Sequence, residues 1–133
     1  MEIHLKAKYQ VILTIIFILA ACSSTNRLSD SAKNIHLPKK SIGIDRSSLA
    51  NDMIYSVDQF IQRNLACSVW SLVEVGESKA VGQLVFTRDG QIYRGEVTEI
   101  WLLQQCGKAL SLRLKITPGS NGGSNIRVAR LSG

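Results

Sequence analysis

The strongest constraint on the fold is a change in the spacing of apolar residues at Cys67. Before Cys67, the apolar residues of segment 48–65 recur every three or four positions. After it they alternate with polar residues, most regularly in residues 109–117. The first spacing indicates a helix with one apolar face, and the second indicates strands that are buried on one side only. The chain therefore predicts one amphipathic helix followed by an antiparallel sheet.

The predicted helix runs from about residue 48 to residue 65. Ser47 or Ser48 marks its start, because a serine hydroxyl can accept a hydrogen bond from a free N–H group of the first turn. The apolar face is wide and combines two adjacent stripes: Leu49, Met53, Val57 and Phe60, and Ala50, Ile54, Val57, Ile61 and Leu65. The polar residues fall mostly on the opposite side: Asn51, Asp52, Asp58, Gln59, Gln62 and Arg63. We expect the apolar face to pack on the core of the domain.

Four or five strands are predicted after the helix, at residues 68–75, 83–87, 91–105, 109–117 and 126–131, with turn or loop regions at 76–82 and 118–125. Asp89-Gly90 is typical of a tight hairpin turn, and Cys106-Gly107 marks the next turn. Gly95 indicates a β-bulge in a long strand. The order of these segments predicts a meander of neighbouring antiparallel strands.

The predicted fold class is therefore α+β, with one amphipathic helix packed on a four- to five-stranded antiparallel meander sheet. A sheet with one apolar face needs a covering layer, and the helix provides it. The other face stays in solvent, and the alternation places Arg113, Lys115 and Arg127 there.

The first residues predict an export signal. An apolar run of 11 residues, from Val11 to Ala21, follows Lys6 and Lys8. A helix that crosses a bilayer needs about 20 apolar residues. A short apolar core after positive charges, with small residues before the cleavage point, is typical of a secretory signal peptide. We expect residues 1–21 to be that peptide; a permanent transmembrane anchor is the alternative that the short run disfavours.

The end of this run, Leu19-Ala20-Ala21-Cys22, resembles the lipobox of bacterial lipoproteins. The resemblance implies a diacylglycerol on the Cys22 sulfur, cleavage before Cys22 and an acyl chain such as palmitate on the new amine, with no other cofactor. Each buried CH₂ contributes about 0.8 kcal/mol, so two or three chains attach a protein stably to a membrane. Ser23, where an Asp favours retention in the inner membrane, fits the periplasmic face of the outer membrane.

Residues 22–45 predict a flexible tether between the lipid and a domain at 46–133. The segment is polar and is interrupted by Pro38, and as a coil it would span about 25 Å. Ile42 and Ile44 indicate that its end docks on the domain.

Two cysteines remain after the signal peptide, Cys67 and Cys106. An exported chain reaches a compartment in which disulfides form. We expect a Cys67–Cys106 bridge that stabilises the domain by about 4 kcal/mol. A free thiol pair and an intermolecular bridge are the alternatives.

The charge is positive and uneven. The formal net charge is +6, and no Asp or Glu follows Glu99. Five cations follow it and are the candidate contacts with a partner: Lys108, Arg113, Lys115, Arg127 and Arg130. A basic surface favours anionic partners, such as lipid headgroups, anionic glycans or an acidic protein face. The alternative is that these residues are only a solvated face. The expected compartment argues against nucleic acid.

The mature chain lacks the residues of common catalytic and metal sites. Its one histidine, His36, lies in the predicted tether, and its two remaining cysteines are far apart. These facts argue against a histidine-dependent triad and a zinc site. Glu96 and Glu99 lie three apart on one predicted strand and so face opposite sides. A hydrolase with two carboxylates from Glu74, Glu77 and Asp89 is the least supported alternative. We expect no enzyme and no metal.

Residues 97–126 carry a second resemblance. Thr98-Glu99-x-Trp101, Cys106-Gly107-Lys108 and Gly122-Gly123 are similar to a pattern of small, uncharacterised envelope lipoproteins of proteobacteria. This resemblance implies no catalytic activity.

These features favour a lipid-anchored envelope protein that acts as an accessory or scaffold subunit, or as a small protein-interaction module. One alternative is a binding module for an anionic envelope polymer, peptidoglycan or lipopolysaccharide. An inhibitor or immunity-type lipoprotein is another.

Overall fold

The computed structural model describes residues 27–132. The signal peptide predicted at 1–21 and the lipidation predicted at Cys22 lie outside these residues. The described elements are α2 (Asp30–Lys33), α3 (Ser47–Asn64), β1 (Trp70–Phe86), β2 (Ile92–Gln105), β3 (Lys108–Pro118) and β4 (Ser124–Arg130). Neither described helix has the length and apolar character that a membrane crossing requires.

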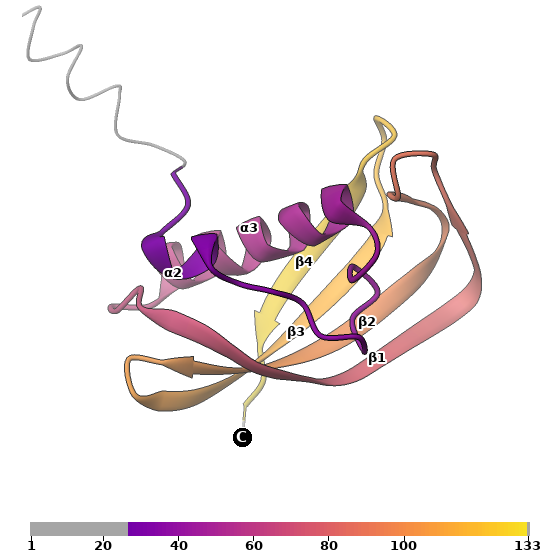
Figure 1. Ribbon diagram of the computed structural model, residues 1–133. Helices are drawn as coiled ribbons and strands as arrows, with labels where there is room; N and C mark the ends of the chain where they lie inside the picture. Colours follow the sequence, from indigo (N-terminus) through magenta and orange to yellow (C-terminus); the bar gives the residue numbers. More distant parts are fainter. Residues whose placement is uncertain (1–26, 133) are drawn as a thin grey trace, which may run out of the picture.

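The four strands form one antiparallel sheet in the order β1-β2-β3-β4, and α3 lies over one of its faces (Figure 1). This arrangement confirms the predicted α+β class, with its amphipathic helix and its meander. The segments predicted as separate strands at 68–75 and 83–87 form the single strand β1. Residues 77–81, predicted as part of a turn, keep pairing with β2 from Glu77↔Ile100 to Val81↔Glu96. The sheet therefore has four strands.

The pairing of β1 with β2 contains bulges. The register shifts between Leu72 and Glu74, between Val75 and Glu77, and again after Val81. Extra residues on one strand bend it and increase its twist, and Figure 1 shows the sheet curving around α3.

The bulge predicted at Gly95 lies on the facing strand. Gly95 has a φ of 89°, and a Cβ atom there would lie 2.8 Å from the carbonyl oxygen of Gln83 and 2.9 Å from Cδ2 of Leu84. The unpaired residues after Val81 press against β2 at this point. Only a residue without a side chain fits both the backbone conformation and the space.

Both predicted turns are present. The Asp89-Gly90 turn is closed by Thr87, whose N–H donates to the carbonyl oxygen of Gln91 at 2.8 Å. Cys106 and Gly107, with φ values of 50° and 77°, connect β2 to β3. Two consecutive residues in the left-handed region are typical of a two-residue hairpin turn that matches the twist of the strands.

The core lies between α3 and the sheet. The helix contributes Leu49, Met53, Val57 and Ile61, all fully buried. The sheet contributes residues that are almost completely buried: Val97, Trp101, Leu112, Leu114 and Ile116. The predicted apolar face of the helix is confirmed.

Two details of the helix differ from the prediction. Arg46 occupies the cap position and no side chain caps the helix, because Ser47 and Ser48 already lie within its first turn. The hydroxyl of Ser48 instead accepts a hydrogen bond from Nε2 of Gln91 at 2.8 Å. Asp58 and Gln59, which the spacing placed mostly on the polar side, are buried. Asp58 is buried because it binds the segment before the helix, residues 27–46, which is described next.

Residues 27–46, here called the strap, fold against the domain. Ala32 in α2, Leu37 and Ser41 are all at least nine-tenths buried. The flexible tether predicted for 22–45 is therefore not what residues 27–45 form. Their buried apolar residues have no helical or strand period, so the pattern gave no sign of packing. The docking predicted from Ile42 and Ile44 holds for Ile42, which packs on the core, whereas Ile44 is exposed.

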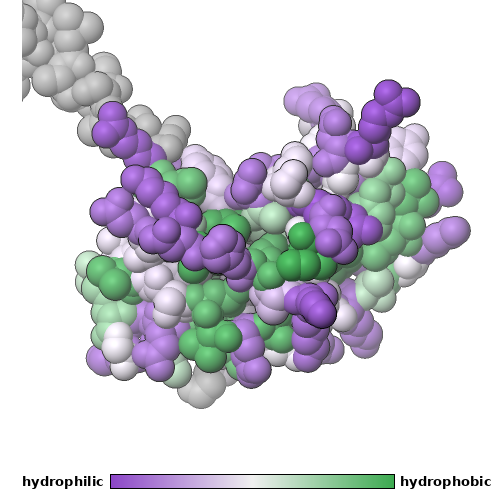
Figure 2. Space-filling view, in the orientation of Figure 1, coloured by the Kyte–Doolittle hydropathy of each residue, from purple (hydrophilic) through white to green (hydrophobic). Residues whose placement is uncertain are grey.

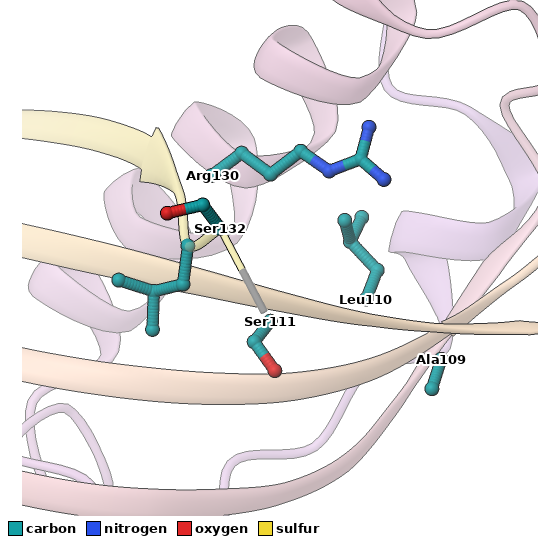
Figure 3. A pocket seen from close by; sticks show the side chains of 6 residues that line it. Ala109, Leu110, Ser111, Arg130 and Ser132 are labelled. Atoms are coloured by element: carbon teal, nitrogen blue, oxygen red, sulfur yellow. The ribbon is translucent and has the colours of Figure 1, made fainter.

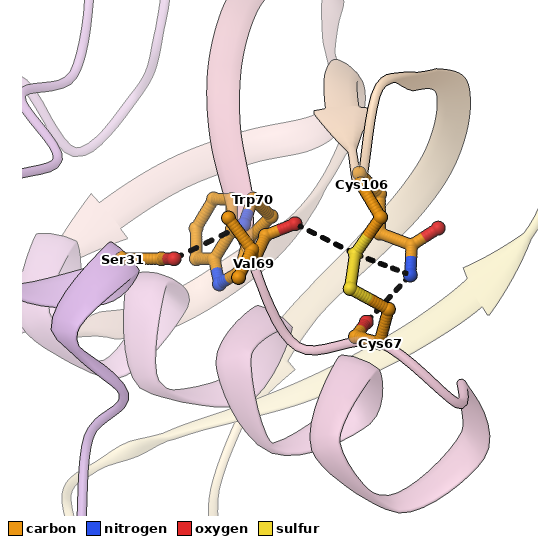
Figure 4. Close-up of a disulfide and its surroundings, with 6 residues drawn as sticks. Ser31, Cys67, Val69, Trp70 and Cys106 are labelled. Atoms are coloured by element: carbon orange, nitrogen blue, oxygen red, sulfur yellow. Dashed lines mark hydrogen bonds between the residues drawn. A yellow bond between two sulfur atoms is a disulfide. The ribbon is translucent and has the colours of Figure 1, made fainter.

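A disulfide joins Cys67, just after α3, to Cys106 in the β2–β3 turn, as predicted (Figure 4). The two Cα atoms are 6.2 Å apart, within the usual range for disulfides. The N–H of Cys106 also donates to the carbonyl oxygen of Val69 at 2.9 Å. The bridge therefore fixes the end of the helix to the sheet.

Polar side chains cover much of the face shown in Figure 2. Hydrophobic side chains gather at the right of that view, over the arm in which β1 turns into β2. Val81, on this arm, is 59% exposed.

Gly95 provides a test of the curved β1–β2 pairing. We expect Gly95→Ala to lower the free energy of unfolding by about 3 kcal/mol, because it adds a steric overlap to the strain of a positive φ. Gly82→Ala is the matched control, since Gly82 has a φ of 75° on the same arm but nothing within 4 Å of an added Cβ. The control should lose only about 1 to 2 kcal/mol. Equal losses in urea titrations of the two variants would contradict the close contact at Gly95.

Candidate functional site

The sheet face away from α3, here called the open face, gathers three of the predicted contact residues. The side chains of Leu112, Leu114 and Ile116 point toward α3, so Arg113 and Lys115 point the other way. Arg127 of β4 lies directly opposite Lys115 in the register. Because residues opposite each other share a face, Arg113, Lys115 and Arg127 form one cationic cluster. All three are exposed.

The cluster has little acidic compensation. Nζ of Lys115 lies 3.4 Å from Oε1 of Glu96, and both side chains are partly exposed. An exposed ion pair of this kind contributes about 0 to 1 kcal/mol. Within residues 27–132, neither Arg113 nor Arg127 forms an ion pair. The cluster therefore retains unpaired guanidinium groups that are available to an anion.

These side chains surround an open depression of about 620 Å³, lined by Glu96, Thr98, Arg113, Lys115, Arg127, Val128 and Ala129. Guanidinium groups present several N–H donors in a fixed plane, which suits carboxylates and phosphates. The depression is therefore lined by three cationic side chains and one carboxylate, Glu96.

The open face changes character from one edge to the other. On β1, Glu74 lies opposite Leu102 and Glu77 lies opposite Ile100, so both acids share the open face with these apolar residues. Lys79 follows on the same face, so the β1 side is of mixed charge. The β3–β4 side carries only cations. The unmixed positive charge of the open face thus lies on its β3–β4 side.

The other two predicted contact residues lie elsewhere. Lys108 lies opposite Gln105, beside the Cys106-Gly107 turn at one end of the sheet. Arg130 lies opposite the buried Leu112 and therefore on the α3 side of the sheet. The structure does not bring the five predicted cations into one site.

Arg130 borders a cavity of about 800 Å³ where β4 ends (Figure 3). Its side chain extends over Leu110, and Ser111 and Ser132 lie nearby. Arg130 is the one charged residue in the lining. The cavity therefore holds no acid–base pair among its lining residues.

Two fully buried carboxylates were not predicted from the sequence, and the first is Asp58 on α3. It accepts hydrogen bonds from Nε1 of Trp70 at 2.9 Å, from the backbone N–H of Ser29 at 2.8 Å and from Nε2 of Gln62 at 2.7 Å. The hydroxyl of Ser29 is a fourth donor.

The second is Glu99 on β2. It accepts hydrogen bonds from Nε1 of Trp101 at 2.8 Å, from the hydroxyls of Ser41 and Ser78 at 3.0 Å each and from the N–H of Ile42 at 2.5 Å. Each carboxylate thus binds one indole and one point of the strap. A buried charge is tolerated when hydrogen bonds satisfy it in this way, so both residues serve to hold the strap on the domain.

The sequence contained a sign of both. Glu99 and Trp101 lie two apart on a strand and so share a face, which Glu96 does not. Asp58 lies four residues after Ile54 and three before Ile61, beside the apolar stripe of the helix. A carboxylate next to a buried stripe or a buried Trp indicates an internal hydrogen-bond acceptor.

The remaining residues considered as catalytic or metal-binding candidates are His36 and the other acidic side chains. His36 is exposed on the strap. Across residues 27–132, no three His, Cys, Asp or Glu side chains group in a way that holds a metal ion.

No protein-family model matches this chain, and neither a curated protein nor a solved structure does. The case for a function therefore rests on the open face and on the residues of the sequence itself.

Glu99 provides a test of the role assigned to the buried carboxylates. We expect Glu99→Gln to lower the free energy of unfolding by about 2 to 4 kcal/mol, because an amide nitrogen would face donors that now bind a carboxylate oxygen. Glu96→Gln is the control on the same strand and should change stability by no more than about 1 kcal/mol. Urea unfolding followed by tryptophan fluorescence measures both. Similar losses of unfolding free energy in the two variants would show that the buried hydrogen bonds of Glu99 do not stabilise the domain.

Proposed function

We propose that this protein is a lipid-anchored lipoprotein of the cell envelope that acts as an accessory or scaffold subunit through protein interaction. The observation that carries the proposal is the convergence of Arg113, Lys115 and Arg127 on a sheet face that neither α3 nor the strap covers. A solvated face needs no such one-sided charge. A surface of this kind attracts and orients an acidic partner.

The lipobox resemblance at Leu19-Ala20-Ala21-Cys22 supports the lipid anchor. The docked strap limits how far the domain can lie from that lipid. Only five peptide steps separate Cys22 from Arg27, where the described structure begins. An extended chain of that length spans at most about 18 Å. A lipid on Cys22 would therefore keep the domain close to the membrane surface, nearer than the 25 Å average of a free tether.

The anchor would also select one end of the domain. Ser31 of the strap accepts a hydrogen bond from the N–H of Trp70 at 3.0 Å, close to the Cys67–Cys106 bridge (Figure 4). This end, with α2 and the disulfide, is the end next to the lipid. We place the partner in the same membrane or directly above it, within reach of the open face.

A second candidate function uses the same cations. Arg113, Lys115 and Arg127 lie on neighbouring strands about 4.8 Å apart, and they suit the repeated anionic groups of peptidoglycan or lipopolysaccharide. Binding to such a polymer depends strongly on salt and requires no protein partner. An inhibitor or immunity-type lipoprotein would use the surface as the leading candidate does, with a toxin or enzyme as its target.

Replacement of Cys22 tests the anchor. We expect Cys22→Ser to abolish labelling by radioactive palmitate and to move the protein from the membrane fraction to the soluble fraction, because the lipid has no other attachment point. The double variant Cys67→Ser with Cys106→Ser is the control, and it should keep its label. Labelling that persists in Cys22→Ser would contradict the anchor.

Charge reversal tests the open face. Cross-linking in cells at the native protein level, followed by detergent extraction and mass spectrometry, identifies what the protein binds. We expect Arg113→Glu with Lys115→Glu to reduce recovery of the partner by about tenfold or more. The control is Lys39→Glu with Lys108→Glu, which reverses the same number of charges elsewhere and should leave recovery unchanged.

The other outcomes distinguish the candidates. Unchanged recovery with both double variants would show that the open face is not the site. Glycan or lipopolysaccharide recovered in place of a protein, with binding that high salt removes, would favour the polymer-binding function.

A further inference from the structure

The sheet has two edges, formed by β1 and β4. An edge strand presents unpaired N–H and C=O groups along one side, and these groups can bind an extended segment of another chain as an additional strand. The edges formed by β1 and β4 differ in whether other parts of the chain bind these N–H and C=O groups.

The edge of β1 is closed by the strap and by bulges. The N–H of Trp70 donates to the hydroxyl of Ser31 at 3.0 Å, and Nζ of Lys40 donates to the carbonyl oxygen of Gly76 at 2.5 Å. The register shifts along β1 also interrupt its edge. Natural sheets protect edges with the same devices, namely bulges, a lysine and a covering segment.

β4 has no bulge and no lysine along its described length, and α3 is the element that packs against it. β4 pairs with β3 over seven residues without a register shift. The N–H of Leu131 donates to the carbonyl oxygen of Ser111 at 2.9 Å, and hydrogen-bonded positions alternate along an antiparallel strand. The N–H and C=O groups of Ile126 and Val128 therefore point to the free side. Within residues 27–132, β3 is the only strand that pairs with β4, so no strand occupies this side.

The side chains along β4 determine which segment fits there. Arg127 lies on the open face beside Lys115, whereas Ile126 and Val128 lie on the α3 side and are only half-buried. Arg130 adds a cation on the α3 side at the end of the strand. A strand added to β4 would place alternate side chains beside Arg127 and beside the two apolar residues.

A second copy of this chain fits the edge poorly. Antiparallel pairing of two β4 strands would place the Arg127 side chains of the two copies on the same face and close together. Like charges at neighbouring positions destabilise strand pairing, and no acidic residue follows Glu99 to compensate them. An acidic segment, by contrast, gains from every cation on this side of the sheet.

We propose that the free edge of β4 binds an extended segment of a partner protein, in which acidic residues alternate with apolar ones, as a fifth strand of the sheet. The inference rests on the proposed function as a protein-interaction module. Backbone hydrogen bonds from Ile126 and Val128 supply binding to any extended chain. Arg127 and Lys115 select acidic side chains on the open face, and Ile126 and Val128 select apolar ones on the other.

The test uses the full chain in detergent micelles and two synthetic peptides of about the length of β4. One peptide alternates Glu with Val, and the other alternates Lys with Val. Amide hydrogen exchange measured by NMR reports on each N–H group. We expect the Glu peptide to slow exchange at Ile126 and Val128 by about tenfold or more and to leave Leu72 on β1 unchanged. The Lys peptide should have no effect.

Two variants separate the edge from its charge. Val128→Pro removes one N–H from the free side and leaves the pairing with β3 in place, and we expect it to weaken peptide binding about tenfold. Arg127→Glu keeps every backbone group and should weaken the Glu peptide by a similar factor, so the test holds even where the proline variant fails to fold. Lys108→Glu is the charge control and should bind normally.

Four outcomes would overturn the inference. The first is a Glu peptide that binds without slowing exchange at Ile126 and Val128, which would place binding on the open face and leave the proposed function intact. The second is the absence of binding. The third is slow exchange at these two amides without peptide, together with a dimer in sedimentation, which would show a second copy at the edge. The fourth is a partner identified in cells that is lost with Arg113→Glu and Lys115→Glu but retained with Val128→Pro, which would show binding to the open face without the β4 edge.

Discussion

The structure depends on two buried carboxylates that bind the strap to the domain. Asp58 and Glu99 each accept four hydrogen bonds, one of them from an indole. A buried charge is costly unless donors surround it, so the Asp58 site is stable only when strap, helix and sheet are all in place, and the Glu99 site needs the strap and the sheet. This mutual dependence fixes the strap across the α3 side of the sheet and next to β1. The β4 edge and the open face are left for other contacts.

The asymmetry of the sheet follows from this arrangement. On the β1 side, the strap supplies Ser31 and Lys40 to edge groups, and bulges interrupt the register. On the β4 side, the register is regular and the charge is positive. One side of the domain is therefore completed by its own chain, and the other side has the form of an incomplete sheet. The proposed interaction function draws on that difference.

Much of the fold follows from local patterns in the sequence. The helix, the order of the strands and the turns at Asp89-Gly90 and Cys106-Gly107 depend on residue spacing or on turn residues that act over short range. The Cys67–Cys106 bridge joins residues 39 positions apart, and it was predictable because only two cysteines remain after the signal peptide. The packing of the strap and the burial of Asp58 do not follow from local patterns, because they depend on partners 12 to 58 positions away in the chain. The merging of two predicted strands into β1 has a similar reason. A glycine-containing segment that resembles a turn by itself becomes a strand when β2 pairs with it.

The candidate site was predictable only in part. Alternation along the last two strands placed Arg113, Lys115 and Arg127 on one face, and the register shows that Lys115 and Arg127 lie opposite each other. Position along the chain could not show that Lys108 and Arg130 lie elsewhere. The place of Lys108 depends on where the β2–β3 hairpin turns, and the place of Arg130 depends on which face of β4 it occupies.

The long separation between the strap and its anchoring residues bears on how the domain forms. Ser41 lies 58 positions from Glu99, yet it belongs to the part of the chain that is synthesised first. Contacts between distant positions form slowly, because the intervening chain must be ordered before they stabilise it. The strap is thus the first described segment to emerge and among the last to find its place. Ser29 and Ser31 can find their partners once α3 and the start of β1 have been made, whereas Ser41 has no partner until Glu99 on β2 follows.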